Sequence, residues 1–343
     1  MIQKKIRSVT ESIALQAEMA AFKASLTEGM QDVKAKIRLI TSHSLQGTPT
    51  GAVLDDAGSA SGKMLRPWLL LQCSSFGPLH EENHERLAML AAMVELTHQA
   101  SLIHDDIIDE APYRRGKLSL QKQYGKHAAV YAGDFLMSRI YYYEAKEQLN
   151  EAAMILSETV EHMCEGEIGQ EMCRYREDAT EDEYLRNIEG KTAALFRSAC
   201  RIGALEAGCS DEVVEKLSKF GETLGIMFQL RDDLIDFLSD SREEGKETHK
   251  DFRDGIYTMP VLKAMQQDAC RQELLPLMRR SLEQDLTPSE IGHMEETVKR
   301  YGGVDATRGQ IRSMQETCYA LLDGLEQNKS VSQLRKLVRY LSI

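Results

Sequence analysis

In residues 102–109 the chain reads Leu-Ile-His-Asp-Asp-Ile-Ile-Asp, an acidic box of the pattern D-D-x-x-D inside an apolar run. The pattern recurs in residues 228–236, which read Phe-Gln-Leu-Arg-Asp-Asp-Leu-Ile-Asp. Residues four apart share one face of a helix, so Asp105 projects with Asp109, and the second box repeats this arrangement. Carboxylates this close repel one another unless a cation or a proton compensates them. The two boxes therefore predict a shared cluster of divalent metal ions.

Magnesium is the ion that these boxes predict. It is a hard cation that keeps several waters and takes one or two carboxylates together with the oxygens of a substrate phosphate. Two aspartate helices could therefore hold a diphosphate through magnesium. Acidic residues on helices more commonly form a solvated face. The apolar neighbours of both boxes, residues 100–103 and 225–228, argue against that alternative.

The composition limits the classes of partner and location. Among 343 residues, 42 Lys and Arg stand against 54 Asp and Glu, a net charge of −12, which disfavours nucleic acid as a partner. The seven cysteines show no C-x-x-C spacing and are interpreted as reduced thiols. The N-terminus lacks the apolar stretch of a signal peptide, and no run approaches the ~20 apolar residues of a membrane helix. We expect a cytoplasmic protein without a membrane span.

The residue pattern predicts an all-α fold. Only seven prolines occur, and good helix formers are abundant. Apolar residues recur with helical period in 87–103, where one buried face is expected, and similar patterns occur in 213–237 and 331–341. Breaks are predicted at residues 47–61, 111–112, 177–180 and 239–245. We expect one domain over residues 1–343, with 1–45 as a helical packing or dimerisation extension.

Basic residues near turns are candidates for binding a diphosphate. Arginine binds phosphate through a two-pronged guanidinium group, and lysine acts as a point charge. Each of these residues taken alone is more commonly surface charge, and a lone histidine such as His98 is more commonly a core residue. His104 beside the first box suggests the His-Asp metal pair of phosphohydrolases, but the further histidines that such a site needs are not evident. The candidates are Lys63, Arg66, Arg114, Arg115, Lys191 and Lys246, together with Gln229 as a hydrogen-bonding group.

From about Gly62 to Pro260 the chain resembles the trans-isoprenyl diphosphate synthases, the polyprenyl synthetase family. The resemblance rests on several motifs that occur in the family's order. They are Gly62–Pro67, Leu102–Asp109, Arg114–Gly116, Ala132–Asp134, Gly190–Phe196, Phe228–Asp236, Gly245–Lys246 with Asp251, and Gly255 with Thr258–Pro260.

This resemblance implies an isoprenoid synthase class I helical bundle with a central cavity lined by both boxes, and usually a homodimer. It implies three magnesium ions bound by Asp105, Asp109 and Asp232, with Asp106 and Asp236 assisting. The same metals would hold an allylic diphosphate, whose site Arg114, Lys191 and Lys246 complete with Thr192 and Gln229. Lys63, Arg66, His98 and Arg115 would bind isopentenyl diphosphate. Asp105, Asp109, Asp232, Lys191 and Lys246 would be the catalytic residues.

The implied reaction is chain elongation. Magnesium and cationic side chains stabilise diphosphate as a leaving group, so the allylic carbon–oxygen bond ionises. The isopentenyl double bond then attacks the allylic cation, and a proton leaves to the released diphosphate. The resemblance requires no protein nucleophile.

Four residues depart from the family pattern. Met64 stands where Arg is common and Ser61 where Gly is common, which predicts a weaker or differently arranged isopentenyl site. His249 replaces a usual Gly, and Ile256 replaces a common Lys, which removes one diphosphate contact. Because Lys63, Arg66 and all six box aspartates are retained, we expect an active enzyme.

The residues before the first box predict a medium- or long-chain product, in the hexaprenyl to octaprenyl range. In the family the growing tail runs beside this helix, and short-chain members carry aromatic residues one turn before the box. Here Ala100 and Ser101, with Thr97 one turn further, are small. Candidates for the tunnel floor, or for ordinary core packing, are Met93, Met137, Tyr141, Tyr142 and Tyr143.

Two other functions are compatible with the boxes. A class I terpene cyclase also ionises prenyl diphosphates, but it has no use for an isopentenyl site, so Lys63, Arg66 and Arg115 favour elongation. A subunit that binds prenyl diphosphates without turnover, or that needs a second subunit, is separated from the first prediction by the activity of the purified chain.

Overall fold

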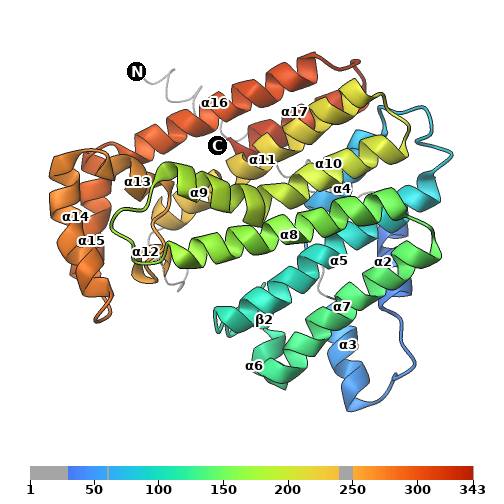
Figure 1. Cartoon of the computed structure of the whole chain (residues 1–343), viewed down its shortest axis with the longest axis horizontal. Coiled ribbons are helices and arrows are strands. Elements are labelled where there is room, and N and C mark those ends of the chain that lie inside the picture. Colours follow the sequence, from blue (N-terminus) through green and yellow to red (C-terminus); the bar gives the residue numbers. More distant parts are fainter. Residues whose placement is uncertain (1–29, 60–61, 239–249, 343) are drawn as a thin grey trace, which may run out of the picture. The chain divides into compact units, whose positions relative to one another are not determined.

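The structure, a computed structural model, describes residues 30–59, 62–238 and 250–342. These residues are almost entirely helical, apart from a two-stranded antiparallel hairpin, so the all-α prediction is confirmed (Figure 1). In chain order the elements are α2 (Gln31–Thr41), α3 (Pro49–Ser59), α4 (Leu65–Ser74), α5 (His84–Ile108), β1 (Tyr113–Arg114), β2 (Lys117–Leu118), α6 (Leu120–Tyr124), α7 (Lys126–Lys146), α8 (Asn150–Met172), α9 (Glu181–Ile188), the π-helical turn η1 (Glu189–Ala193), α10 (Ala194–Glu206), α11 (Asp211–Leu238), α12 (Lys250–Arg253), α13 (Met259–Met265), α14 (Asp268–Ser281), α15 (Pro288–Arg300), α16 (Gly303–Asp323) and α17 (Lys329–Leu341).

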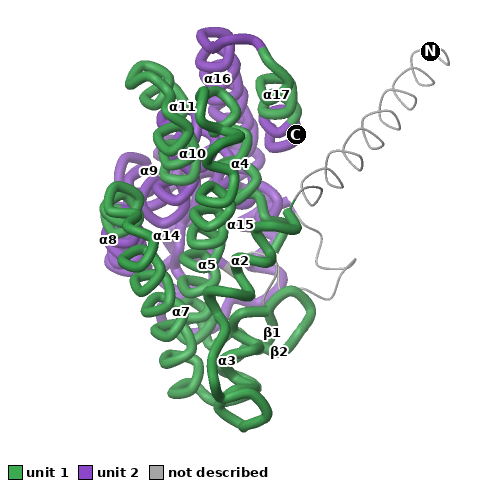
Figure 2. The backbone as a smooth tube through the Cα atoms, turned by 90° about the vertical axis from the view of Figure 1, so that its right-hand side faces the viewer, with its two compact units in different colours: residues 1–158, 198–217, 328–336 green, residues 159–197, 218–327, 337–343 purple. Residues whose placement is uncertain are grey.

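The chain forms two compact units, coloured separately in Figure 2. Unit 1 comprises residues 1–158, 198–217 and 328–336, and unit 2 comprises residues 159–197, 218–327 and 337–343. Four helices, α8, α10, α11 and α17, begin in one unit and end in the other. The single domain expected over 1–343 stays a prediction. Of the expected N-terminal extension, residues 1–29 lie outside the described residues, and α2 packs against α5.

Helix α5 is the core of unit 1. It packs against α2, α4 and α7, and α5 and α7 lie side by side in Figure 1. The helix predicted over 87–103 is confirmed, but the single buried face is wrong, because every residue from Leu87 to Thr97 is buried. A helix that is apolar on all sides is typical of a position enclosed by neighbouring elements.

Helix α3 lies where a break was predicted, at 47–61. The segment begins as a helix should, because the Thr48 hydroxyl accepts the Gly51 N–H at 3.0 Å and Pro49 occupies the first turn. Its glycines permit close packing, since a Cβ atom at Gly51 would collide with the Leu45 carbonyl oxygen. Glycine-rich composition here reflects close approach of backbones, and the prediction of a loop is corrected.

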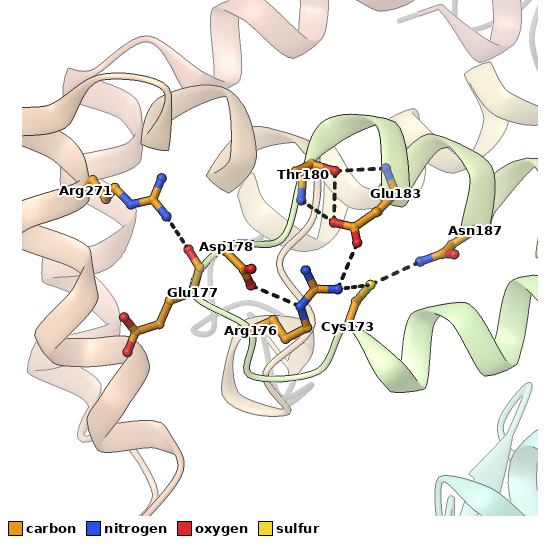
Figure 3. A network of polar contacts seen from close by, with 8 residues as sticks. All are labelled: Cys173, Arg176, Glu177, Asp178, Thr180, Glu183, Asn187 and Arg271. Carbon is orange, nitrogen blue, oxygen red and sulfur yellow. Dashed lines mark hydrogen bonds and ion pairs between the residues drawn. The ribbon is translucent and has the colours of Figure 1, made fainter.

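The predicted break at 177–180 is confirmed as the loop before α9. Thr180 caps α9 with a capping box shared with Glu183. Arg176 bridges Asp178, at 3.0 Å, and Glu183, at 2.8 Å, while Arg271 donates to the Glu177 carbonyl oxygen at 2.7 Å (Figure 3). These contacts fix the loop within unit 2.

The remaining predicted helices are also present. Helix α11 covers the pattern at 213–237 and α17 covers that at 331–341, while α5 ends at Ile108, before the break predicted at 111–112. The break predicted at 239–245 lies outside the described residues. None of the described helices is long and apolar enough to cross a membrane.

Candidate active site

The first box lies at the C-terminal end of α5 in unit 1. Asp105 is half-buried, Asp109 is exposed, and Asp106 is only 5% exposed. Carboxylates are unfavourable at this end of a helix, because the helix dipole is negative there, and the last turn of α5 carries no basic residue. A cation bound to Asp105 and Asp109 would relieve this unfavourable electrostatic energy.

Asp106 is paired with an arginine of the hairpin. The Arg114 Nε donates to Asp106 Oδ1 at 2.8 Å, and a second guanidinium nitrogen contacts the same oxygen. The roles predicted for Asp106 at the metal and for Arg114 at the allylic diphosphate stay predictions. A ligand at either residue would have to share this ion pair or replace it.

The predicted isopentenyl diphosphate residues converge in unit 1. The β1–β2 hairpin turns through Arg115 and Gly116, both with positive φ, 53° and 78°, a backbone suited to tight two-residue hairpins. This turn brings the Arg115 guanidinium against Gly62, where a Cβ atom would lie 2.7 Å and 2.9 Å from its two terminal nitrogens. Lys63 follows Gly62 and is exposed.

His98 lies among the same cations. Burial, followed by the positive charges of Arg66, Arg115 and Arg114, lowers the pKa of His98 to about 2. The imidazole is therefore neutral at physiological pH and can act through hydrogen bonds only. All three arginines therefore lie within electrostatic range of this ring, and together they supply positive charge that a multiply charged anion needs.

Met64 occupies the position where the family commonly has arginine, but its side chain has a different, structural role. It precedes α4 with φ of 53°, in the left-handed region, and its side chain is 3% exposed. The methionine therefore belongs to the core of unit 1. Ser61 and His249, two further departures, lie outside the described residues.

The second box, on α11 in unit 2, contains one deeply buried aspartate. Asp233 is 3% exposed and accepts hydrogen bonds from the Tyr184 hydroxyl and, at 2.9 Å, from Gln229 Nε2. Gln229 Oε1 in turn accepts from the Thr192 hydroxyl at 2.8 Å. Burial raises the pKa of Asp233 to about 7, against the opposing effect of its two hydrogen bonds. These contacts form a continuous hydrogen-bonded chain from Thr192 through Gln229 and Asp233 to Tyr184. Thr192 and Gln229, both predicted to bind diphosphate, therefore already have hydrogen-bond partners.

Asp232 and Asp236 are the half-buried members of the second box. Burial, and secondarily the charge of Asp251, raises the pKa of Asp236 to about 6. Asp251 also acts on Asp233, so this residue of α12 faces the box. It was not among the predicted metal ligands, although its motif after the second box was evident in the sequence.

The donor set fits magnesium chemically. It consists of carboxylate oxygens, and burial, with a smaller contribution from the charge of Asp251, raises the pKa of Asp236, which a bound cation would oppose. In the described ranges 30–59, 62–238 and 250–342, no three His, Cys, Asp or Glu side chains form a preformed metal cage. This is compatible with a metal that takes most of its remaining ligands from water and phosphate.

Lys191 and Lys246 are the two lysines predicted at the allylic diphosphate. Lys191 lies in the π-helical turn η1, and its Nζ donates to Glu167 Oε2 at 3.0 Å, which anchors it to α8. Lys246 lies outside the described residues.

Unit 2 also contains a pocket of about 400 Å³ that sequence reasoning did not predict. None of the predicted site residues lines it. Its basic and acidic groups contact one another, since Arg197 lies 3.4 Å from His162 Nδ1 and 3.9 Å from Glu222. The lining residues are His162, Glu165, Gly166, Arg186, Asn187, Glu189, Gly190, Ala194, Arg197 and Glu222.

The residues predicted to set product length are small and mostly buried. Thr97 and Ala100 are each 2% exposed, and Ser101, half-buried, donates to the His98 carbonyl oxygen at 2.9 Å. Tyr141 and Tyr142 lie on the outer surface of unit 1, where both are more than half exposed. They are therefore removed from the predicted tunnel floor. Met93 and Tyr143 are buried, and Met137 is half-buried, so these three stay candidates.

Known proteins resemble this chain in sequence over most of its length. The sequence model described as Polyprenyl synthetase matches residues 50–291. Component 2 of the heptaprenyl diphosphate synthase of Geobacillus stearothermophilus is 33% identical over 282 residues, which are 82% of this chain and 86% of that protein.

Two solved structures extend the similarity to the fold. A decaprenyl diphosphate synthase from Rhodobacter capsulatus superposes with a TM-score of 0.82 and 32% identity, covering 94% of this chain and 98% of that one. A polyprenyl synthase from Caulobacter crescentus CB15, complexed with calcium and isoprenyl diphosphate, gives a TM-score of 0.80 and 27% identity over 94% of this chain and 97% of that one.

Proposed function

Because this chain belongs to the polyprenyl synthetase family, we propose that it joins isopentenyl diphosphate head to tail, with trans geometry, to an allylic diphosphate. The chain is a trans-polyprenyl diphosphate synthase, a prenyltransferase that elongates prenyl chains. The residues that bind each substrate, the metal, the product length and the assembly are the proposed part.

One observation carries the assignment of the isopentenyl diphosphate site. Arg66 and Arg115 both act electrostatically on the neutral His98 in unit 1. Lys63 follows Gly62, the residue against which the Arg115 guanidinium lies. A terpene cyclase would have no use for this second cationic site. The arginines supply paired N–H donors, and His98 supplies a hydrogen bond without adding charge.

We propose that Asp105, Asp109 and Asp232, assisted by Asp106 and Asp236, hold magnesium on the allylic diphosphate, with three ions in the loaded site. Calcium accompanies isoprenyl diphosphate in the Caulobacter relative, which supports a divalent ion at the allylic substrate. Lys191, Lys246, Arg114, Thr192 and Gln229 complete this site in the proposal. Asp251 joins them because it faces Asp233 and Asp236.

The chain's residues would promote ionisation by placing positive charge where the leaving group gains negative charge. Bound magnesium neutralises the diphosphate and stabilises its departure. Lys191 and Arg114 add N–H donors to the departing oxygens. The allylic carbon–oxygen bond breaks with its electron pair on oxygen, the isopentenyl double bond forms the new carbon–carbon bond, and the released diphosphate takes the proton.

We propose a product of six to eight isoprene units or longer, a side-chain precursor for a quinone. The small, buried Thr97 and Ala100 before the first box support this length. The names of the heptaprenyl and decaprenyl synthases described above are compatible with it.

We propose that the enzyme is a homodimer whose partner covers α7. Tyr131, Tyr141 and Tyr142 on this helix, and Met154 on α8, are all more than half exposed. Exposed aromatic clusters of this kind are typical of protein interfaces. Equilibrium sedimentation should give twice the mass of the chain, and Tyr131→Lys with Tyr142→Lys should give a monomer. A wild-type monomer would contradict the proposal.

A dependence on a second subunit is the alternative that one observation favours. The Geobacillus relative carries the printed name component 2, which describes it as part of a larger enzyme. We propose a reducing, cytoplasmic location for either form, because all seven cysteines are free thiols.

The purified chain should be incubated with magnesium, radiolabelled isopentenyl diphosphate and farnesyl or geranylgeranyl diphosphate, and the extracted products separated by length. A ladder ending in a medium- or long-chain product is expected. A folded chain that incorporates no label contradicts self-sufficient elongation and favours the dependence on a second subunit. Hydrocarbon formed from the allylic substrate alone would identify a cyclase.

A further inference from the structure

In unit 1, Arg66 and Arg115 act on a carboxylate that neither the family motifs quoted above nor the proposed site includes. Glu95 lies on α5, three residues before His98, and is 1% exposed. Burial raises the pKa of its carboxyl group, and the charges of Arg66 and Arg115 oppose that effect. A buried acidic side chain is costly unless charge and hydrogen bonds compensate it, so its burial within electrostatic range of two arginines requires an explanation.

The contacts of Glu95 reach both parts of the isopentenyl site. Its carboxylate accepts a hydrogen bond from the backbone N–H of Gly62, the residue before Lys63. Arg66 lies on the first turn of α4, and Arg115 lies at the tip of the β1–β2 hairpin. The Glu95 carboxylate thus interacts with the segment before α4, with α4 itself and with the β1–β2 hairpin.

The hairpin contributes a conformation that needs such an anchor. Arg115 has φ of 53°, which is unfavourable for a residue with a side chain. Its guanidinium lies against Gly62, where no side chain intervenes. A buried negative charge that acts on both Arg66 and Arg115 and accepts the Gly62 N–H favours this arrangement.

We propose that Glu95 is a positioning residue for isopentenyl diphosphate, whose buried carboxylate holds the Gly62 turn and the guanidinium groups of Arg66 and Arg115 in their binding arrangement before the substrate arrives. This proposal rests on the assignment of these cations to isopentenyl diphosphate. Glu95 itself does not contact the substrate in the proposal.

Electrostatics alone makes the opposite prediction. A negative charge behind two arginines weakens the attraction of a diphosphate, so its removal would lower the KM for isopentenyl diphosphate. Removal of an anchor would instead raise this KM, because the cations would have to be ordered at the cost of binding energy. The direction of the change therefore separates the two effects.

The test compares Glu95→Gln and Glu95→Asp with the wild-type full-length enzyme. The first keeps the shape and removes the charge, and the second keeps the charge and withdraws it by one methylene. Both should raise the KM for isopentenyl diphosphate about tenfold or more, the scale of one lost charge-assisted hydrogen bond. The KM for the allylic substrate should stay within about twofold, and kcat at saturation should change less than the raised KM.

Glu144→Gln is the matched control. Glu144 lies on α7 in the same unit, is 6% exposed, and has a pKa raised by burial alone. Its replacement should leave the KM for both substrates unchanged. A general loss of packing would raise both KM values in either variant, whereas a positioning role affects one KM in the Glu95 variants only.

Three results overturn the proposal: a lower KM for isopentenyl diphosphate in Glu95→Gln, an unchanged KM in both Glu95 variants, or an equal rise for both substrates. If Glu95→Gln does not fold, Glu95→Asp alone decides by the same criteria. Wild-type enzyme without elongation activity would contradict the proposed function instead, so the two failures are distinguishable.

Discussion

Replacing His98 with glutamine should make the protein less sensitive to acid. The pKa of His98 is lowered to about 2 by burial and by three arginines, whereas the unfolded chain titrates near the ordinary value of 6.5. Protons therefore bind the unfolded state more strongly. The stability associated with neutral His98 is fully present above about pH 6.5 and is lost as the pH falls towards the folded pKa.

The magnitude follows from the separation of the two pKa values. Each pH unit between them removes about 1.4 kcal/mol from the free energy of unfolding, so acidification from about pH 7.5 to about pH 5 costs wild type about 2 kcal/mol through His98. His98→Gln lacks this loss. Other titrating groups contribute similarly to both proteins and largely cancel when the two losses are compared.

Urea unfolding, followed by circular dichroism at both pH values, measures the effect. Wild type should lose about 2 kcal/mol more than His98→Gln on acidification. The exposed His127→Gln controls for the removal of a histidine as such and should behave as wild type. Equal losses in wild type and His98→Gln would refute the placement of a neutral imidazole among the arginines.

Three further predictions concern the boxes, the product and the hydrogen-bonded chain of unit 2. Asp105→Asn and Asp232→Asn should each lower kcat about 10²- to 10³-fold or more, with unchanged circular dichroism, and near-normal turnover in either would contradict the metal assignment. Ser101→Phe should shorten the product on thin-layer chromatography, and an unchanged ladder would exclude a tunnel beside this residue. Tyr184→Phe should lower the free energy of unfolding by about 1–3 kcal/mol because Asp233 stays buried with fewer donors. The Tyr301 hydroxyl donates to the half-buried Glu273, so Tyr301→Phe should cost less than Tyr184→Phe, and equal effects would argue against the buried chain.

Sequence composition and periodicity predicted the helices that carry both boxes, because α5 and α11 are long, at 25 and 28 residues, and contain no proline. They could not predict α3, where glycine serves close packing between backbones. Periodicity also predicted one buried face for α5, because polar residues such as Glu95 and Gln99 were expected on an exposed face. In the structure both are buried. Local pattern cannot report which neighbours enclose a helix.

Motif reasoning assigned the metal to Asp105, Asp109 and Asp232 with Asp106 and Asp236 assisting, but it could not predict the partner of each aspartate. The structure distinguishes them by partner, because Asp106 is paired with Arg114 and Asp233 with Tyr184 and Gln229. Gln229 lies one helical turn before Asp233 on α11, whereas Tyr184 lies on α9 and reaches Asp233 only through tertiary packing. The role of Glu95 could not be predicted from the sequence either, because Arg66 and Arg115 are distant from it along the chain.

The π-helical turn η1 has a consequence for how this protein tolerates changes in length. A π turn holds one residue more than an α turn, so residues 189–193 contain a surplus residue between α9 and α10. Deletion of Gly190 would regularise the helix, while the faces of α9 and α10 on either side would keep their directions. Elsewhere in these helices a one-residue deletion rotates everything downstream by about 100°. The segment that carries Lys191 and Thr192 is therefore a place where evolution can insert or remove a residue and re-aim two side chains without repacking the helix beyond them.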